Sequence, residues 1–246
     1  MVAFDLGIAA GADGLELDVH LSADGQVVAI HDATLDRSTR SSGTVSQKTA
    51  AELGALDATP FYGIDLELPW TGARAGLPLL RDVLERHPLA ATIIELKGST
   101  PALGPAVVDV VRAAGAEARV CLASFSSDVL SAARMAGPEL ATSASREEGL
   151  RALQCSWTGL PFPRRRVYSA FQVPERSGRL KVASRRFVRA VHRAGCAVQV
   201  WTVNEEADMR RLMDLGVDGL ITDRPDLAVR VRDAWVAERH HAGHSR

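Results

Sequence analysis

Apolar residues along the chain follow two alternating patterns, short runs typical of strands and longer amphipathic stretches typical of helices. The strand-like segments are residues 14–21, 92–97, 119–125, 140–144, 167–173, 197–203 and 219–223. Helical periodicity covers residues 3–11, 78–87, 101–114, 126–136, 146–154, 184–194, 205–214 and 225–239. This alternation predicts an α/β fold in which helices cover a parallel sheet.

The first strand segment carries polar residues at every second position. A strand places residues two apart on one face, so Glu16, Asp18 and His20 share a side. An Asp-Gly pair follows at residues 24 and 25, and this pair favours a two-residue hairpin turn. Counting outward from such a turn, Asp18 would lie opposite His31, and carboxylates would meet an imidazole. The same alternation also describes a half-exposed strand whose charges are simply solvated.

The segment 92–97 is a second apolar run with charged residues, Glu95 and Lys97, on one face. Charged groups at the end of a buried strand are costly unless they are paired or bind a metal. With Glu16 and Asp18, Glu95 brings three carboxylates from two strands. This pattern favours a bound cation.

Length and composition fit one soluble domain. The 246 residues approach the size of a (β/α)8 barrel, and an apolar fraction of 46% suffices for a large core. The net charge of -1 gives no general attraction to nucleic acid or to an anionic membrane. The 3 cysteines lack metal-ligand spacing and favour reduced thiols, so we expect a cytoplasmic location. No apolar run is long enough for a transmembrane segment.

Residues 32–76 lack strong periodicity, and we expect them to form an insertion after the hairpin. The segment includes aromatics in Pro60–Gly63 and Pro69–Gly72. Barrel active sites lie at the carboxyl-terminal ends of strands, so the insertion either covers the substrate or is a packing excursion. The predicted domain spans 1–239, and 240–246 is expected to be a flexible tail.

A series of motifs runs in order along the chain. They are Gly11–Val19, Asp24-Gly25, His31–Thr39, Gly43–Val45, Leu77–Leu80, Ile94–Lys97, Val200–Asn204 and Gly216–Pro225. Together, from about residue 3 to 230, they resemble the glycerophosphodiester phosphodiesterase family. The resemblance implies a TIM barrel, (β/α)8, with a small insertion. It also implies hydrolysis of deacylated phospholipids such as glycerophosphocholine to an alcohol and glycerol 3-phosphate.

The same resemblance implies roles for individual residues. These are Glu16, Asp18 and Glu95 as ligands of a divalent cation, His31 as one of two acid/base histidines, Lys97 at the phosphate and Trp201 at the glycerol. Carboxylate ligands suit Mg²⁺ or Ca²⁺ better than zinc. In the family mechanism a glycerol hydroxyl attacks phosphorus, one histidine takes its proton, and the other protonates the leaving alcohol.

The chain also departs from the family pattern. Members begin with a strand ending in His-Arg-Gly and a Pro-Glu-Asn-Thr turn, and neither motif occurs here. The arm 26–31 returns too soon for a parallel crossover, so seven barrel strands accompany eight helices. We expect the first strand and second histidine to be missing, through a late start or a real loss, and activity to be impaired. The alternatives are an inactive barrel that binds glycerophosphodiesters or a protein partner, and a sphingomyelinase-D-like enzyme.

Other polar groups favour structural interpretations. Arg164–Arg166 precede a strand and are expected to form a solvated loop at the opposite end of the barrel. Asp218 and Asp223 flank the last strand, and we expect both to be structural.

Overall fold

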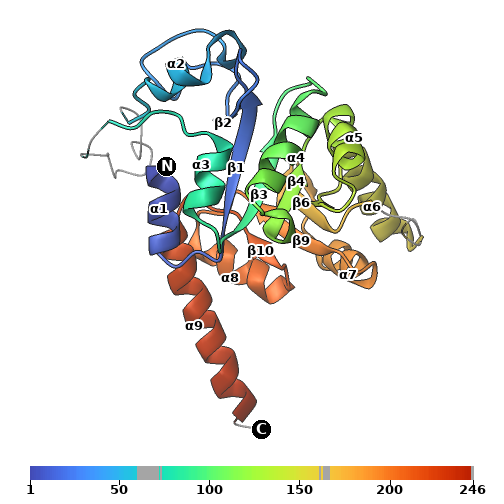
Figure 1. Ribbon diagram of the computed structural model, residues 1–246. Helices are drawn as coiled ribbons and strands as arrows, with labels where there is room; N and C mark the ends of the chain where they lie inside the picture. The colour runs from blue at the N-terminus through green and yellow to red at the C-terminus, as the bar shows by residue number, and fades with distance from the viewer. Residues whose placement is uncertain (60–71, 73, 161, 163–166, 245–246) are drawn as a thin grey trace. The chain divides into compact units, whose positions relative to one another are not determined.

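The computed structural model describes residues 1–59, 72, 74–160, 162 and 167–244 (Figure 1). They form two compact units, one of residues 1–5 and 14–141 and one of residues 6–13 and 142–246. The expected aromatic segments, Pro60–Gly63 and Pro69–Thr71, and the basic Arg164–Arg166 lie outside the described residues. Helix α1 (Val2–Ala9) opens the chain. Within the described part of the chain, no helix is both long and apolar enough to cross a membrane.

The sheet of the first unit has the strand order β2-β1-β3-β4-β5. Its strands are β1 (Gly14–Leu21), β2 (Val27–Ala29), β3 (Ala91–Leu96), β4 (Val120–Ala123) and β5 (Ala141–Thr142), the last of which falls at the boundary of the units. Strand β1 pairs antiparallel with β2 and parallel with β3, which in turn pairs parallel with β4. The parallel pairing confirms the sheet type predicted for the strands at 14–21, 92–97 and 119–125.

The two faces of β1 differ as the alternation predicts. Leu15, Leu17 and Val19 are buried, whereas Glu16 and Asp18 on the other face are only partly buried. Helices α3 (Leu80–Arg86), α4 (Leu103–Ala113) and α5 (Ser127–Ala136) belong to this unit. A short 3-10 turn, η3 (Glu117–Arg119), leads into β4.

Helices α4 and α5 approach closely at Gly104. A Cβ atom at this position would lie 2.6 Å from the backbone nitrogen of Ala133 and 2.9 Å from the carbonyl oxygen of Val129. Neither backbone atom can move without displacing its helix. Glycine therefore sets the spacing of the two helices.

The predicted hairpin register is wrong by one residue. Val19 pairs with Ala29 and His20 with Val28, so Asp18 is next to Ile30 rather than His31. The loop contains three residues instead of two, because Ser22 N–H donates to Gln26 O over 2.9 Å. Gly25 takes a positive φ of 76°, and Ser22 Oγ donates to Asp24 Oδ1 over 2.6 Å. A serine side chain thus stabilises a longer turn than Asp-Gly alone predicts.

The described part of the segment 32–76 has a small core of its own. It contains the 3-10 turn η1 (Val45–Gln47) and helix α2 (Ala50–Gly54), which begins at a capping box of Thr49 and Glu52. Its buried residues Leu35, Val45 and Leu53 form one core cluster with Val28 of β2, Ile30 and Leu77. The segment is therefore anchored by burial, and a role in covering substrate stays a prediction.

The second unit has a parallel sheet of strand order β10-β9-β6. Its elements are α6 (Arg146–Thr158), β6 (Ala170–Pro174), the short hairpin of β7 (Arg176–Ser177) and β8 (Leu180–Lys181), α7 (Arg185–Arg193), β9 (Ala197–Trp201), α8 (Glu206–Leu215), β10 (Gly219–Leu220) and α9 (Pro225–His244). Phe171 and Phe187 centre its core, with ring centroids 5.7 Å apart. Helix α9 continues through His244, beyond the residue 239 expected from periodicity.

Two aspartates in the second unit confirm their structural interpretation. Asp218 Oδ2 accepts hydrogen bonds from Val198 N–H over 2.7 Å and contacts His192 Nε2 at 2.8 Å. Asp223 Oδ2 accepts one from Asn204 Nδ2 over 2.9 Å. Both carboxylates fix the loops around β9 and β10.

Candidate active site

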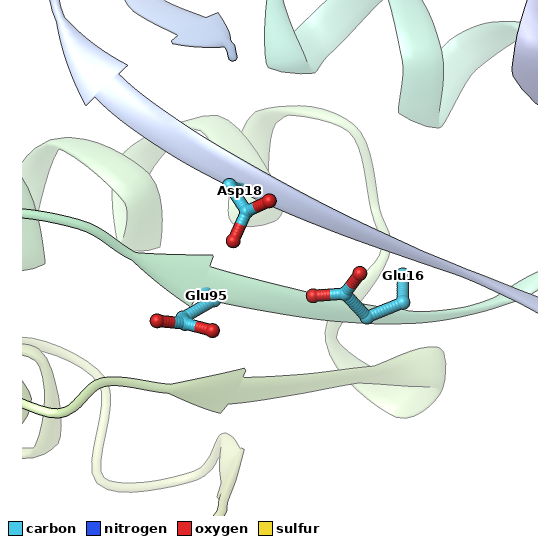
Figure 2. Close-up of side chains that lie close together, drawn as sticks. All are labelled: Glu16, Asp18 and Glu95. Carbon is cyan, nitrogen blue, oxygen red and sulfur yellow. The ribbon is translucent and has the colours of Figure 1, made fainter. Parts of the chain in front are cut away.

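Three carboxylates converge on one face of the first unit's sheet. Glu16 and Asp18 project from β1 and Glu95 from β3, as Figure 2 shows. One oxygen from each lies within 4.8 Å of the others. The predicted convergence is therefore confirmed.

Strand register explains why these side chains meet. In the parallel pairing of β1 with β3, Asp18 lies beside Glu95 and Glu16 beside Ile93. Glu16 is two residues before Asp18, so it shares the same face. Sequence alternation and register together place the three acids at one point.

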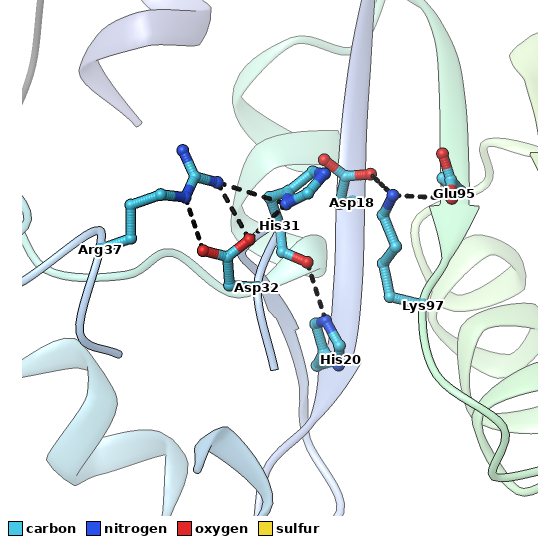
Figure 3. A network of polar contacts seen from close by, with 7 residues as sticks. All are labelled: Asp18, His20, His31, Asp32, Arg37, Glu95 and Lys97. Carbon is cyan, nitrogen blue, oxygen red and sulfur yellow. Dashed lines mark hydrogen bonds and ion pairs between the residues drawn. The ribbon is translucent and has the colours of Figure 1, made fainter. Parts of the chain in front are cut away.

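Lys97 follows β3 and lies between two of the acids. Its Nζ is 2.8 Å from Glu95 Oε1 and 3.1 Å from Asp18 Oδ1 (Figure 3). Only 19% of the lysine side chain is exposed. Burial disfavours the charged ammonium, but its contacts with Glu95 and Asp18 outweigh this cost and raise the pKa of Lys97. Lys97 is thus a partly buried positive charge within the acidic cluster.

Glu95 is a partly buried acid, with 17% of its side chain exposed. Burial raises the pKa of its carboxyl, and this effect exceeds the opposing effect of Lys97. Its Oε1 atom is buried and, despite the Lys97 ion pair, makes no hydrogen bond of good geometry with the described residues. An oxygen in this state gains free energy from a further positive partner.

The donor set fits a hard divalent cation. All three donors are carboxylate oxygens, which suit Mg²⁺ or Ca²⁺. Oxygens within 4.8 Å of one another can lie together at about 2.0–2.6 Å from one ion. The cluster can therefore hold one such cation.

His31 belongs to a second polar group, on the loop after β2. Its Nδ1 lies 2.5 Å from Asp32 Oδ1, and Arg37 Nε donates to Asp32 Oδ2 over 2.6 Å (Figure 3). Hydrogen bonds from Arg37 and His31 hold the pKa of Asp32 well below its usual range. Asp32 Oδ1 is placed to accept a hydrogen bond from His31 Nδ1, which favours the tautomer that carries its proton on Nδ1.

The His31 group lies within electrostatic range of the carboxylates. A charge on the His31 ring contributes to lowering the pKa of Glu95, although burial dominates. His20 Nε2 contacts the carbonyl oxygen of His31 at 3.1 Å and ties this backbone to β1. The side chain of His31 is 58% exposed.

Several residues around the site escaped the sequence interpretation. Asp32 and Arg37 lie within the motif His31–Thr39, but the sequence assigned neither of them a role. A carboxylate next to a histidine is nevertheless a signal for an oriented imidazole. Phe125, just after β4, lies with its ring centroid 5.8 Å from Lys97 Nζ. The predicted strand 119–125 included Phe125, but β4 ends at Ala123, so strand periodicity does not fix the position of this side chain.

Trp201 is the last residue of β9 in the second unit. It pairs with Pro174 at the end of β6. Its position at the carboxyl end of a parallel strand is typical of site residues in α/β folds. Its contact with glycerol stays a prediction.

The sequence matches one family along most of its length. Residues 1–227 match the model of the "Glycerophosphoryl diester phosphodiesterase family". The chain belongs to this family. Its members are phosphoric diester hydrolases, so the chain is an enzyme of the glycerophosphodiester phosphodiesterase class, and glycerophosphodiesters are the compounds that it hydrolyses.

Individual relatives agree with this assignment. The chain is 33% identical over 245 residues to a probable glycerophosphodiester phosphodiesterase 2 of Mycobacterium tuberculosis. This match covers 96% of this chain and 84% of the relative. It is 31% identical over 246 residues to a glycerophosphodiester phosphodiesterase of Caldanaerobacter subterraneus, covering 94% and 90% of the two chains.

A solved structure supports the fold class. The crystal structure of a glycerophosphodiester phosphodiesterase from Agrobacterium tumefaciens aligns with a TM-score of 0.70 and 28% identity, over 91% of this chain and 89% of that one. The fold is therefore a TIM-barrel-like α/β fold, which confirms the predicted class.

Proposed function

We propose that this phosphodiesterase releases glycerol 3-phosphate and an alcohol, with a divalent cation at Glu16, Asp18 and Glu95 and with proton transfer by His31. The observation that carries the proposal is the convergence of three carboxylate oxygens within 4.8 Å of one another. Such a reaction belongs to lipid and glycerol metabolism. Its substrate is a small anionic diester.

The three acids would hold Mg²⁺ or Ca²⁺. The bound ion would neutralise nonbridging phosphate oxygens and lower the pKa of an attacking hydroxyl. Lys97 would bind the phosphate as well, since its ammonium already lies 2.8–3.1 Å from two of the acids. The Lys97 ammonium would thus neutralise part of the negative charge of the substrate's phosphate.

His31 would exchange a proton with the reacting oxygens through Nε2. Asp32 accepts at Nδ1 and would stabilise the imidazolium that forms, while Arg37 keeps Asp32 charged. One positioned acid/base group contributes about 10²–10⁴-fold. Since the family mechanism uses two histidines, we expect a chain of these 246 residues to be slower than one with both by a factor of this order.

Trp201 would line the glycerol side of the site. Its ring offers apolar surface to the carbon backbone of glycerol, whereas the hydroxyls require polar partners. This assignment rests on the Val200–Asn204 motif and on the position of Trp201 at the end of β9.

The test is release of glycerol 3-phosphate from glycerophosphocholine in the presence of Mg²⁺ or Ca²⁺. We expect turnover that chelation abolishes and added cation restores. The Glu95→Gln variant should lose this turnover. The control variant Glu85→Gln, at an exposed position of α3, should keep it. Binding of glycerophosphocholine without hydrolysis would instead support the inactive binding barrel.

A further inference from the structure

The segment from β7 to α7 in the second unit concentrates positive charge. Residues 176–193 contain seven Lys or Arg residues and no Asp or Glu, although the whole chain has a net charge of -1. All seven side chains are exposed. They form the basic surface, which consists of Arg176, Arg179, Lys181, Arg185, Arg186, Arg189 and Arg193.

The β7–β8 hairpin brings three of these residues together. Arg176 pairs with Lys181 across the hairpin, so both side chains project from one face. Val182 N–H donates to the carbonyl oxygen of Glu175 over 3.0 Å and closes the base of the hairpin. Arg176 Nη2 donates to the carbonyl oxygen of Arg179 over 3.3 Å, a contact that leaves the charge uncompensated.

Helix α7 carries the other four residues on its exposed face. Its buried face packs in the core of the second unit and consists of Phe187, Val188, Ala190 and Val191. Arg189 lies four residues from both Arg185 and Arg193, so the three are neighbours along the helix. The amphipathic pattern of α7 therefore orders its positive charges in one stripe.

This arrangement opposes the stability of α7. Like charges four residues apart repel each other. Arg185 and Arg186 also occupy the first turn, where the helix dipole favours acids, and α7 has no acid there. Folding alone does not explain why these positions are basic.

Neighbouring acids do not neutralise the basic surface. Glu175, next to the hairpin, pairs with Arg211 at 2.6 Å. Asp218 contacts His192 of α7 at 2.8 Å. Within the part of the chain that the structure describes, none of the seven basic side chains forms an ion pair. An anionic partner outside the chain would relieve their repulsion.

The composition of the surface favours a membrane over a nucleic acid. Leu180, beside the hairpin turn, is 36% exposed and can enter a headgroup layer. Phe187 is the only Phe, Tyr or Trp of residues 176–193, and it is buried, so it offers no ring on which a base could stack. Clusters of about 4–8 basic residues on an amphipathic helix are typical of binding to anionic lipids.

We propose that the basic surface docks the protein reversibly on membranes that contain anionic lipids. Each basic residue near such a membrane strengthens binding by roughly fivefold, so a few residues in contact suffice for docking. The inference concerns binding and does not depend on the catalytic roles proposed above. Docking would place the enzyme where phospholipids are deacylated to glycerophosphodiesters.

Vesicle flotation tests the inference. One set of vesicles contains phosphatidylcholine alone, and the other contains phosphatidylcholine with phosphatidylglycerol. We expect the protein to float only with the second set. Raising NaCl from about 0.1 M to about 1 M shortens the Debye length from about 10 Å to about 3 Å and should release the protein.

A charge-matched pair of variants locates the docking surface. Arg185→Gln with Arg186→Gln removes two charges from the basic surface and should lower the vesicle partition coefficient by about 5- to 25-fold. The control, Arg81→Gln with Arg230→Gln, removes two exposed charges from α3 and α9 and should bind as the parent does. Thermal melts check the fold, and the Tm of the first variant should not fall, because its first turn loses unfavourable charge.

The outcomes separate the inference from the proposed function. Absence of binding to the anionic vesicles, equal binding to both sets, or equal partition coefficients for the two double variants would overturn the inference. Displacement of the bound protein by duplex DNA at an equal phosphate concentration would assign the surface to nucleic acid and would also overturn it. Because flotation measures no hydrolysis, a protein that floats but releases no glycerol 3-phosphate would refute the proposed function alone.

Discussion

The carboxylate cluster and the His31 group are two polar sites built in different ways. Glu16, Asp18 and Glu95 project from paired strands, and each is only partly exposed. His31 follows β2 on a loop, and its side chain is 58% exposed. The sheet positions side chains that project from its strands, whereas a side chain on a loop needs contacts with other side chains to orient it.

The difference matches the chemistry that each group would perform. Cation ligands need fixed spacing, which a hydrogen-bonded sheet supplies. An acid/base imidazole needs access to substrate and a fixed tautomer, and Asp32 with Arg37 supplies the second. Removing the imidazole should therefore change the reaction without disturbing the cluster.

The largest effect is expected for His31→Ala. Proton transfer acts in the transition state, so kcat should fall by about 10²–10⁴-fold while KM changes little. Steady-state kinetics with glycerophosphocholine measure both constants. Partial recovery with added imidazole would confirm the proton-transfer role. Unchanged kcat with a raised KM would assign His31 to binding instead.

Sequence reasoning succeeded where strand periodicity governs position. The alternation of Glu16 and Asp18 with Leu15 and Leu17 predicted both their shared face and the buried opposite face. Glu95 could be added because parallel strands align at one edge. These inferences need only the period of a strand.

Sequence reasoning failed where one local contact decides the geometry. The Ser22 hydroxyl lengthens the hairpin loop, and this single residue shifts the register of His31. Asp32 and Arg37 could not be assigned as partners of His31, because loop side chains have no period to reveal their direction. Phe125 was predicted within the strand 119–125, but β4 ends two residues before it, at Ala123.

A smaller effect is expected for Lys97→Met. Loss of a charged contact to phosphate costs about 1.5–3 kcal/mol, so KM should rise by about 10- to 100-fold. The same change removes a positive charge from the cluster and should strengthen cation binding. Lys181→Met, at an exposed position of β8, is the matched control. Unchanged KM would remove Lys97 from the phosphate site.

The smallest effect concerns stability and pH at Asp32. Its pKa is lowered in the folded protein by Arg37 and His31, so it stabilises the fold above the ordinary carboxyl range, and this contribution is lost as pH falls. Asp32→Asn should lower the Tm at pH 7 by about 2–6 °C. The difference should shrink below about pH 4. Thermal melts at a series of pH values measure this difference in Tm. The Asp36→Asn variant, from the same loop, is the control. A difference in Tm between the parent and Asp32→Asn that does not change with pH would contradict the ion pairing.

The central claim is that Glu16, Asp18 and Glu95 form one cation site, and calorimetric titration with Mg²⁺ or Ca²⁺ tests it most directly. We expect one ion per chain in the parent protein and in Glu85→Gln. Glu16→Gln, Asp18→Asn and Glu95→Gln should each weaken binding by at least about tenfold, since each removes a charged ligand. Absence of binding in the parent, or an affinity in all three variants equal to that of the parent, would contradict the account.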